Sequence, residues 1–141
     1  MSVEEENKES IRRLTEEVCN NKNFSLLPEV VAEDFRSYGS EGEGMKGLDD
    51  FRLGIEMTFK AFPDFRYEIE DMFAVDDKLA VRYRLTGTHK GEWMGIPPTG
   101  KKFNTTSIYL CRMENGKQVE AWGCTDYLTF FKQVGLTLPG Q

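Results

Sequence analysis

The chain has 141 residues and a formal net charge of −6 at pH 7. This acidity argues against a nucleic-acid groove or a basic membrane-binding patch. Ten phenylalanines, five tyrosines and two tryptophans suit an apolar cavity or a dense core. A single domain over residues 1–141 is expected, since a chain of this length can bury a sizeable core.

Cysteine usage and hydropathy indicate a cytoplasmic protein. The three cysteines, Cys19, Cys111 and Cys124, form no CxxC pair and no cysteine–histidine metal spacing, which is typical of reduced thiols. The N-terminus lacks the apolar segment of a secretory signal, and no run of about 18 apolar residues predicts a membrane-spanning helix. We therefore expect no metal site, no membrane partner and no nucleic-acid partner.

The first half of the chain has helical periodicity. Ile11, Leu14 and Val18 share one face of the first predicted helix, and Pro28 suits the first turn of a short second one. The third helix is expected to end at Pro63. A short strand over 34–40 and a glycine-rich acidic loop through residue 47 are predicted before it. The predicted helices are residues 2–21, 24–33 and 48–62.

After Pro63 the period changes to that of strands, rich in aromatic and β-branched residues. Asp-Asp at 76–77 and Asn-Gly at 115–116 predict two-residue hairpin turns. The predicted strands are residues 65–75, 78–89, 102–113 and 117–128, and a short helix over 127–135 follows. This order predicts an α+β fold, with helices on one face of a curved antiparallel sheet. The common nucleotide-binding, metalloprotease and hydrolase motifs are absent.

Counting outward from a two-residue turn at 115–116 predicts the strand register. Tyr109 would lie opposite Trp122, Cys111 opposite Glu120, and Thr105 opposite Asp126, all on one face of the sheet. Apolar residues are then found on both faces. One face is expected to meet the helices and the other a second subunit, so a homodimer is predicted.

Asp126 is the candidate catalytic residue. It stands where a strand gives way to an aromatic segment, and desolvation by such neighbours would raise its pKa and suit it to acid–base catalysis. Aspartate also caps helices well, and a helix is predicted just after it. The sequence weighs these two interpretations equally.

Two other polar residues have both a functional and a structural interpretation. His89, the only histidine, would be a proton carrier at a pocket rim or, as we favour, an imidazole that fixes the following loop. Arg82 would anchor an anion in a pocket or, as we favour, form an ion pair with Asp71 across two strands.

Aromatic residues complete the candidates. Tyr109 and Trp122 either line a cavity or fill a core. Trp93 and Met94 lie in a loop bounded by glycine and proline, where exposed apolar groups often form a lid or a contact.

Three segments carry a family resemblance: "FPDF" at 62–65, "GTHKGEWMGIPPTGKK" at 87–102 and "ENGKQVEAWGCTD" at 114–126. Their sequence, order and spacing resemble the SnoaL-like polyketide cyclase family of the nuclear transport factor 2-like superfamily. The resemblance covers nearly the whole chain. It implies an α+β cone, in which a strongly bent antiparallel sheet wraps around helices and leaves a pocket at its open end.

The resemblance also implies a chemistry. Cyclases of this family close a polyketide ring by an intramolecular aldol reaction without metal or cofactor, and their acid–base aspartate matches Asp126. Tyr38 stands where many relatives have histidine. We therefore expect an apolar small-molecule substrate, no cofactor, and cyclase or isomerase activity assisted by His89 and Tyr38. The expected pocket residues are Tyr38, Arg82, Trp93, Tyr109 and Trp122.

Two alternatives remain open at this point. One is a non-catalytic protein that binds an apolar small molecule. The other is a structural dimerisation module whose pocket is filled by its own side chains.

Overall fold

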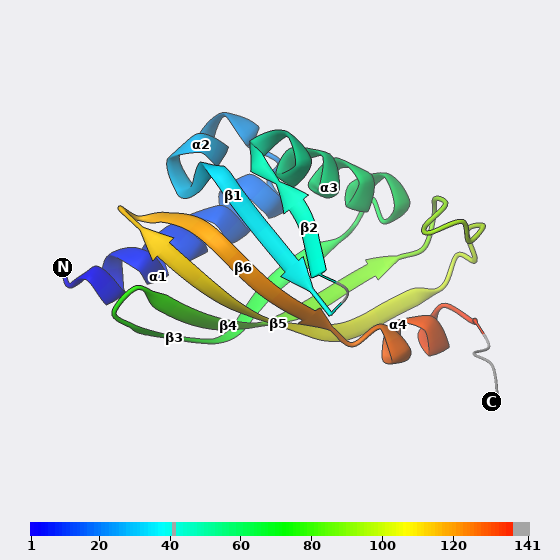
Figure 1. The fold of residues 1–141 in the computed structure, drawn as a ribbon. Coiled ribbons are helices and arrows are strands. Elements are labelled where there is room, and N and C mark those ends of the chain that lie inside the picture. The colour runs from blue at the N-terminus through cyan, green and yellow to red at the C-terminus, as the bar shows by residue number, and fades with distance from the viewer. Residues whose placement is uncertain (41, 137–141) are drawn as a thin grey trace.

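A computed structural model describes residues 1–40 and 42–136 as an α+β fold (Figure 1). Residue 41, within the segment predicted to be a loop, and residues 137–141 lie outside the described part. The helical elements are α1 (Val3–Arg13), the π-helical segment η1 (Leu14–Asn20), the 3-10 turn η2 (Phe24–Leu26), α2 (Leu27–Val30), α3 (Gly47–Ala61) and α4 (Tyr127–Gln133). The strands are β1 (Val31–Gly39), β2 (Gly42–Lys46), β3 (Arg66–Val75), β4 (Lys78–Thr88), β5 (Lys102–Glu114) and β6 (Lys117–Thr125).

These strands form one mixed sheet in the order β2-β1-β6-β5-β4-β3. Strands β1 and β6 are parallel, and the other neighbouring pairs are antiparallel. Helices α1, α2 and α3 gather on one side of the sheet, and α4 lies at the end of the molecule away from the start of α1 (Figure 1). The predicted α+β cone is confirmed, while the prediction of a wholly antiparallel sheet is wrong for the β1–β6 pair.

The first predicted helix has two parts. Ser2 caps α1, because its Oγ accepts a hydrogen bond from the backbone N–H of Glu5 at 3.1 Å. Ile11, Leu14 and Val18 are buried as their spacing predicts. From Leu14 onward the helix has π geometry, which is rare and is often associated with functional sites.

The short second helix ends earlier than predicted. Pro28 lies in the first turn of α2, as expected, but the strand β1 already begins at Val31. Val31 and Phe35 are both buried on the inner face of the sheet, so burial of these side chains outweighs the helical pattern. The glycine-rich segment after β1, predicted to be a loop, contains the strand β2. Its glycines are uncommon in strands, which is why the pattern predicted a loop.

Both predicted hairpin turns are confirmed. Asp76 and Asn115 have φ angles of +53° and +52°, as two-residue turns of this kind require. The first turn pairs Asp71 with Arg82, as counted from the sequence. The second pairs Glu114 with Lys117.

The strand register predicted beyond the second turn is wrong by one residue. Met113 still pairs with Gln118, but Arg112 pairs with Glu120, so β6 has a bulge at Val119. Because strand side chains alternate, this bulge moves each later residue of β6 to the opposite face from the one predicted. Tyr109 therefore lies opposite Gly123 instead of Trp122.

Backbone hydrogen bonds hold the loop between β4 and β5 where it leaves and rejoins the sheet. His89 N donates to the carbonyl of Lys101 at 2.9 Å, and Gly100 N donates to the carbonyl of His89 at 2.8 Å. Lys90 N and Gly91 N both donate to the carbonyl oxygen of Ala61, the last residue of α3. The loop is thereby fixed against the C-terminal end of that helix.

Gly91 is the residue that permits this contact. A Cβ atom at position 91 would lie 2.5 Å from the Lys60 carbonyl oxygen, which is backbone and cannot move aside cheaply. We expect Gly91→Ala to lower the free energy of unfolding by about 1–3 kcal/mol, as overpacking does. Urea unfolding measures this. Gly39→Ala is the control, because a Cβ there meets nothing within 4 Å, and an equal loss in both variants would contradict the packing argument.

Candidate small-molecule cavity

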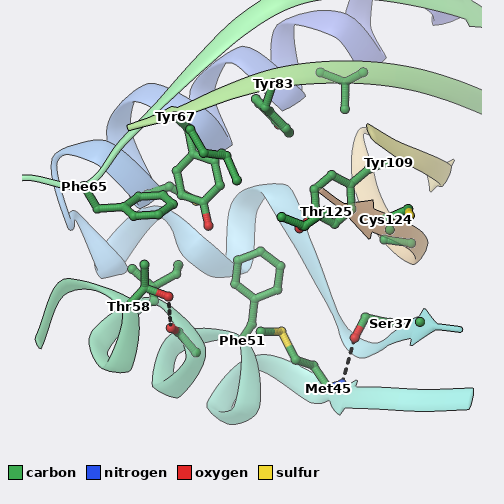
Figure 2. Close-up of a pocket in the computed structure, with 18 of the residues that line it drawn as sticks. Ser37, Met45, Phe51, Thr58, Phe65, Tyr67, Tyr83, Tyr109, Cys124 and Thr125 are labelled. Atoms are coloured by element: carbon green, nitrogen blue, oxygen red, sulfur yellow. Dashed lines mark hydrogen bonds between the residues drawn. The ribbon is translucent and has the colours of Figure 1, made fainter. Parts of the chain in front are cut away.

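A cavity of about 770 Å³ lies between the inner face of the sheet and the helices. Figure 2 shows Phe51 and Thr58 of α3 on one side of it and Tyr67 and Tyr83 of β3 and β4 on the other. Tyr109 of β5 lies farther along the sheet (Figure 2). A volume of this size is in the range of pockets that hold small organic ligands.

The lining is neutral. Its polar groups are hydroxyls, thiols, backbone groups, one amide and the Trp93 indole N–H, and none of the described lining residues is Asp, Glu, Lys, Arg or His. Transfer of an unpaired ion into such surroundings is costly, so the cavity suits an uncharged ligand. The aromatic and methionine residues of the lining are Phe35, Tyr38, Met45, Phe51, Met57, Phe62, Phe65, Tyr67, Tyr83, Trp93, Met94, Phe103, Tyr109, Tyr127 and Phe130.

Several hydroxyl protons of the lining are already used within the protein. Thr15 Oγ1 donates to the Ile11 carbonyl at 2.8 Å, so the Tyr83 hydroxyl, 2.9 Å away, donates to Thr15. Thr58 Oγ1 donates to the Gly54 carbonyl at 2.8 Å. Toward a ligand, Thr15 and Thr58 therefore offer lone pairs rather than protons.

The "AWGCT" segment, residues 121–125, leaves space in the cavity because Gly123 has no side chain. Gly123 lies directly opposite Tyr109, and a Cβ added there would collide with the Tyr109 ring. The ring can therefore lie against the β6 backbone. This leaves room in the cavity that any other residue at position 123 would reduce.

Burial keeps the titratable groups of the lining neutral. It raises the pKa of the Tyr109 hydroxyl to about 12, and those of the Cys19 and Cys111 thiols to about 12 as well. It raises the pKa values of Tyr67 and Tyr83 further above their usual range. At neutral pH these side chains are hydrogen-bonding or apolar groups without charge.

Asp126 is absent from the described residues that line the cavity. Its carboxylate is exposed and caps α4, with Oδ1 accepting from Thr129 N at 3.0 Å and Oδ2 from Thr129 Oγ1 at 2.7 Å. These hydrogen bonds lower the pKa of Asp126, so the predicted desolvated carboxyl with a raised pKa is wrong. The helix-cap interpretation is confirmed. Thr125 and Tyr127, on either side of it in the chain, do line the cavity.

His89 lies outside the lining. Its side chain is buried, with Nδ1 accepting from the Thr99 backbone N–H at 3.4 Å and lying 3.3 Å from Thr99 Oγ1. The ring packs on Phe62 with centroids 5.6 Å apart. This placement agrees with the interpretation of His89 as a residue that fixes the loop, and it offers no direct path to a ligand.

Two of the predicted aromatic residues line the cavity as expected. Tyr109 does so from β5, and Trp93 from the β4–β5 loop. Trp93 packs on Phe62 with centroids 5.2 Å apart. Met94 next to it also lines the cavity, although its side chain is 69% exposed.

Trp122 and Tyr38 lie differently from the prediction. The bulge in β6 turns Trp122 to the outer face of the sheet, where it is absent from the described lining and 40% exposed. Tyr38 reaches the rim of the cavity, but its ring stacks on Trp122 with centroids 5.4 Å apart. Partial desolvation and then the Glu120 carboxylate raise the pKa of Tyr38.

Arg82 is on the outer face as well. Its Nε lies 3.6 Å from Oε1 of Glu70, and Asp71 is its partner in the strand register. The structural interpretation of Arg82 is therefore favoured, with Glu70 rather than Asp71 as the ion-pair partner. Such an exposed pair contributes little to stability.

Tyr67 and Thr125 were missed by the sequence analysis. The alternation in "FRYEIEDMF" already places residues 65, 67 and 69 on one face of a strand, which is the signal that could have identified Tyr67. Thr125 could not be found in this way, because the bulge reverses the face of every residue near it.

Two further features concern the part of the chain that the structure describes. Over residues 1–40 and 42–136, no three His, Cys, Asp or Glu side chains gather closely enough to hold a metal ion. Within the same residues, no helix combines the length and the apolar character needed to cross a membrane.

An α+β cone with a neutral aromatic cavity defines a class of small-molecule pocket proteins. The chain belongs to the SnoaL-like polyketide cyclase family, whose model matches residues 9–134. The family resemblance seen in the sequence is thereby confirmed.

Individual relatives agree with this assignment. DnrD of Streptomyces peucetius is 36% identical over 133 residues, which cover 92% of this chain and 90% of that protein. AcmA of Streptomyces galilaeus is 25% identical over 131 residues, which cover 92% and 91%. Both relatives are named aklanonic acid methyl ester cyclases.

Solved structures match over similar lengths. IdmH from Streptomyces antibioticus superimposes with a TM-score of 0.79 at 29% identity, covering 92% of this chain and 99% of that one. AclR from Streptomyces galilaeus gives a TM-score of 0.81 at 27% identity, covering 93% and 96%.

The buried tyrosines and cysteines predict alkaline destabilisation. Their pKa values are raised on folding, so the stability they contribute is present below the unfolded values of about 8.5 and 10 and is lost as pH rises toward 12. We expect the melting temperature to fall between about pH 9 and pH 12. Tyr109→Phe should make this fall shallower above pH 10, and an unchanged slope would show that Tyr109 ionises freely in the folded protein.

Proposed function

We propose that this protein is a cofactor-independent cyclase that closes a ring of an uncharged, largely apolar polyketide-type substrate. The observation that carries the proposal is the neutral aromatic cavity of about 770 Å³. The relatives DnrD and AcmA are named for a methyl ester, in which the acid carries no charge at that position. Such a compound suits the described lining residues, none of which has a charged side chain.

The proposed reaction is an intramolecular aldol closure. A base takes a proton from a carbon next to a carbonyl, and that carbon then attacks a second carbonyl carbon of the same molecule. The π electrons of the second carbonyl move to its oxygen, which receives a proton. The product is an isomer of the substrate, so proton acceptors and donors are all that the protein must supply.

Asp126 is the proposed proton acceptor, acting at the rim rather than inside the cavity. Its lowered pKa keeps the carboxylate ionised at neutral pH, which is the form a base requires. Each oxygen accepts one hydrogen bond from Thr129 and retains a second acceptor site. Its two chain neighbours line the cavity, and the proposal requires a bound substrate to extend past them to the Asp126 carboxylate.

Asp126→Asn separates the two roles of this residue. Asparagine caps helices about as well as aspartate, so the melting temperature should be retained. Turnover of aklanonic acid methyl ester should fall by roughly 100-fold or more, because a general base contributes about that much. Product formation is followed by chromatography, and ligand affinity by calorimetry.

Asp126→Ala is the matched control for the cap. It should lower the melting temperature by several degrees, because the Thr129 N–H loses its acceptor. If Asp126→Asn retains full turnover, the carboxylate is not the base, and its role is the cap alone.

A non-catalytic binding protein is the second candidate. The absence of Asp, Glu, Lys and His from the described lining residues favours it. Under this hypothesis aklanonic acid methyl ester raises the melting temperature by binding the folded state, yet the wild-type protein converts none of it.

We also propose that the protein acts as a homodimer through the outer face of the sheet. Ile108, Leu110 and Trp122 are 55%, 47% and 40% exposed on this face, and Leu110 pairs directly with Trp122 across β5 and β6. Exposed apolar groups gathered in this way are typical of a contact surface. The occupant proposed is the same face of a second copy, since a twofold interface pairs identical patches.

Leu110→Lys tests the dimer. A charge at the centre of this patch should halve the mass measured by light scattering at micromolar concentration. Leu53→Lys on α3 is the control, because Leu53 is 55% exposed on the helical side of the molecule. A monomeric wild-type mass would refute the proposed interface.

A further inference from the structure

Three tyrosines, Tyr67, Tyr83 and Tyr109, point into the cavity from neighbouring strands. The Tyr83 hydroxyl is bound to Thr15, and the Tyr109 hydroxyl has the Thr125 hydroxyl beside it. Within residues 1–40 and 42–136 the hydrogen bonds of Tyr67 to side chains involve only its backbone, and its hydroxyl makes none. Of these three phenols it is the one with no other hydroxyl beside it, so its proton is free for a ligand.

The backbone of Tyr67 is held by a side chain. Asn20 Nδ2 donates to the Tyr67 carbonyl, and the Tyr67 N–H donates to Asn20 Oδ1, both at 2.9 Å. β3 is an edge strand, so these backbone groups have no further strand to pair with. Asn20 is the last residue of the π-helical segment η1. Its side chain takes the place of a neighbouring strand by bonding both the N–H and the carbonyl of Tyr67.

The ring of Tyr67 is fixed by its neighbours. It packs edge-on against Phe65 at a centroid distance of 4.8 Å and against Tyr83 at 5.5 Å. Figure 2 shows its hydroxyl directed into the space between the strands and α3. Backbone and ring together give this hydroxyl a defined position, which is what a preorganised donor requires.

We propose that the Tyr67 hydroxyl donates a hydrogen bond to the substrate carbonyl oxygen that gains charge as the ring closes, with Asn20 as its positioning residue. This inference rests on the proposed cyclase function. The donor keeps its proton throughout: the new carbon–carbon bond forms, the carbonyl π pair moves to oxygen, and the hydrogen bond shortens as that oxygen becomes negative. The proton that finally neutralises the oxygen is the one removed from the attacking carbon.

The chemistry of the site agrees with this role. Burial raises the pKa of Tyr67 well above its usual range, so the phenol stays protonated at any physiological pH. The described residues around this donor are largely apolar and uncharged, so its hydrogen bond to the oxygen is little screened by water. Because the charge on the oxygen grows in the transition state, the hydrogen bond accelerates the reaction rather than only strengthening binding.

Tyr67→Phe removes the donor and retains the ring. With aklanonic acid methyl ester as substrate, kcat should fall by roughly 100-fold, as when one oxyanion donor is lost, while KM changes less than threefold. An unchanged kcat would overturn the inference.

A second measurement does not depend on turnover. The probe is 9-fluorenone, an uncharged aromatic ketone, and the readout is the infrared band of its carbonyl group when bound. A hydrogen bond from Tyr67 should place this band at lower frequency in the wild-type complex than in the Tyr67→Phe complex. Equal frequencies in the two complexes would overturn the inference. A shifted band with no turnover of the methyl ester by the wild type would overturn the cyclase function alone and leave the donor in place.

The positioning role of Asn20 has its own test. Asn20→Ala should broaden the carbonyl band of bound 9-fluorenone and lower kcat by less than Tyr67→Phe does. In the double variant, kcat should equal that of Tyr67→Phe, because Asn20 acts through a hydroxyl that is no longer present. Additive losses in kcat would show that Asn20 acts only on general stability.

Discussion

Alternation of side chains across β5 and β6 is the constraint on which the cavity depends. The bulge at Val119, close to the Asn-Gly turn, shifts the alternation in β6 by one residue. Beyond it, Ala121, Gly123 and Thr125 face the helices, so small side chains of β6 lie where large ones would fill the space. The same shift moves Trp122 outward and leaves Tyr109 lying against a glycine. One inserted residue thus determines both the room in the cavity and the apolar outer face.

Charge is separated from the cavity by the sheet itself. Arg82, Glu70 and Glu120 lie on the outer face or at the edge of the sheet, where water screens them. The inner face holds neutral phenols, hydroxyls and thiols. A ligand in this cavity is recognised by shape and by a small number of hydrogen bonds, since an unpaired ion there would be costly to desolvate. Asp126 is exposed to water, and its chain neighbours Thr125 and Tyr127 line the cavity.

Local signals in the sequence predict most of the fold, because they depend on nearby residues. Helical spacing identifies Ile11, Leu14 and Val18 as buried, and the two turns are identified by Asp76 and the Asn-Gly pair. The candidate site is less predictable, because it depends on long-range effects. No local pattern reveals the bulge at Val119, so Trp122 is assigned to the wrong face. The lowered pKa of Asp126 likewise follows from two hydrogen bonds with Thr129 and not from its aromatic neighbours.

The parallel pairing of β1 with β6 has a consequence for how the protein folds. It joins Tyr38 to Trp122, so nearly the whole chain must be made before this contact can form. Loops of this length close slowly compared with hairpins such as β3–β4 and β5–β6, whose contacts are local. The antiparallel meander therefore has a kinetic advantage over the pairing that brings β1 and α3 to the sheet. Because Phe35 of β1 and Phe51 of α3 form one wall of the cavity, the binding site is complete only once this long-range pairing has formed.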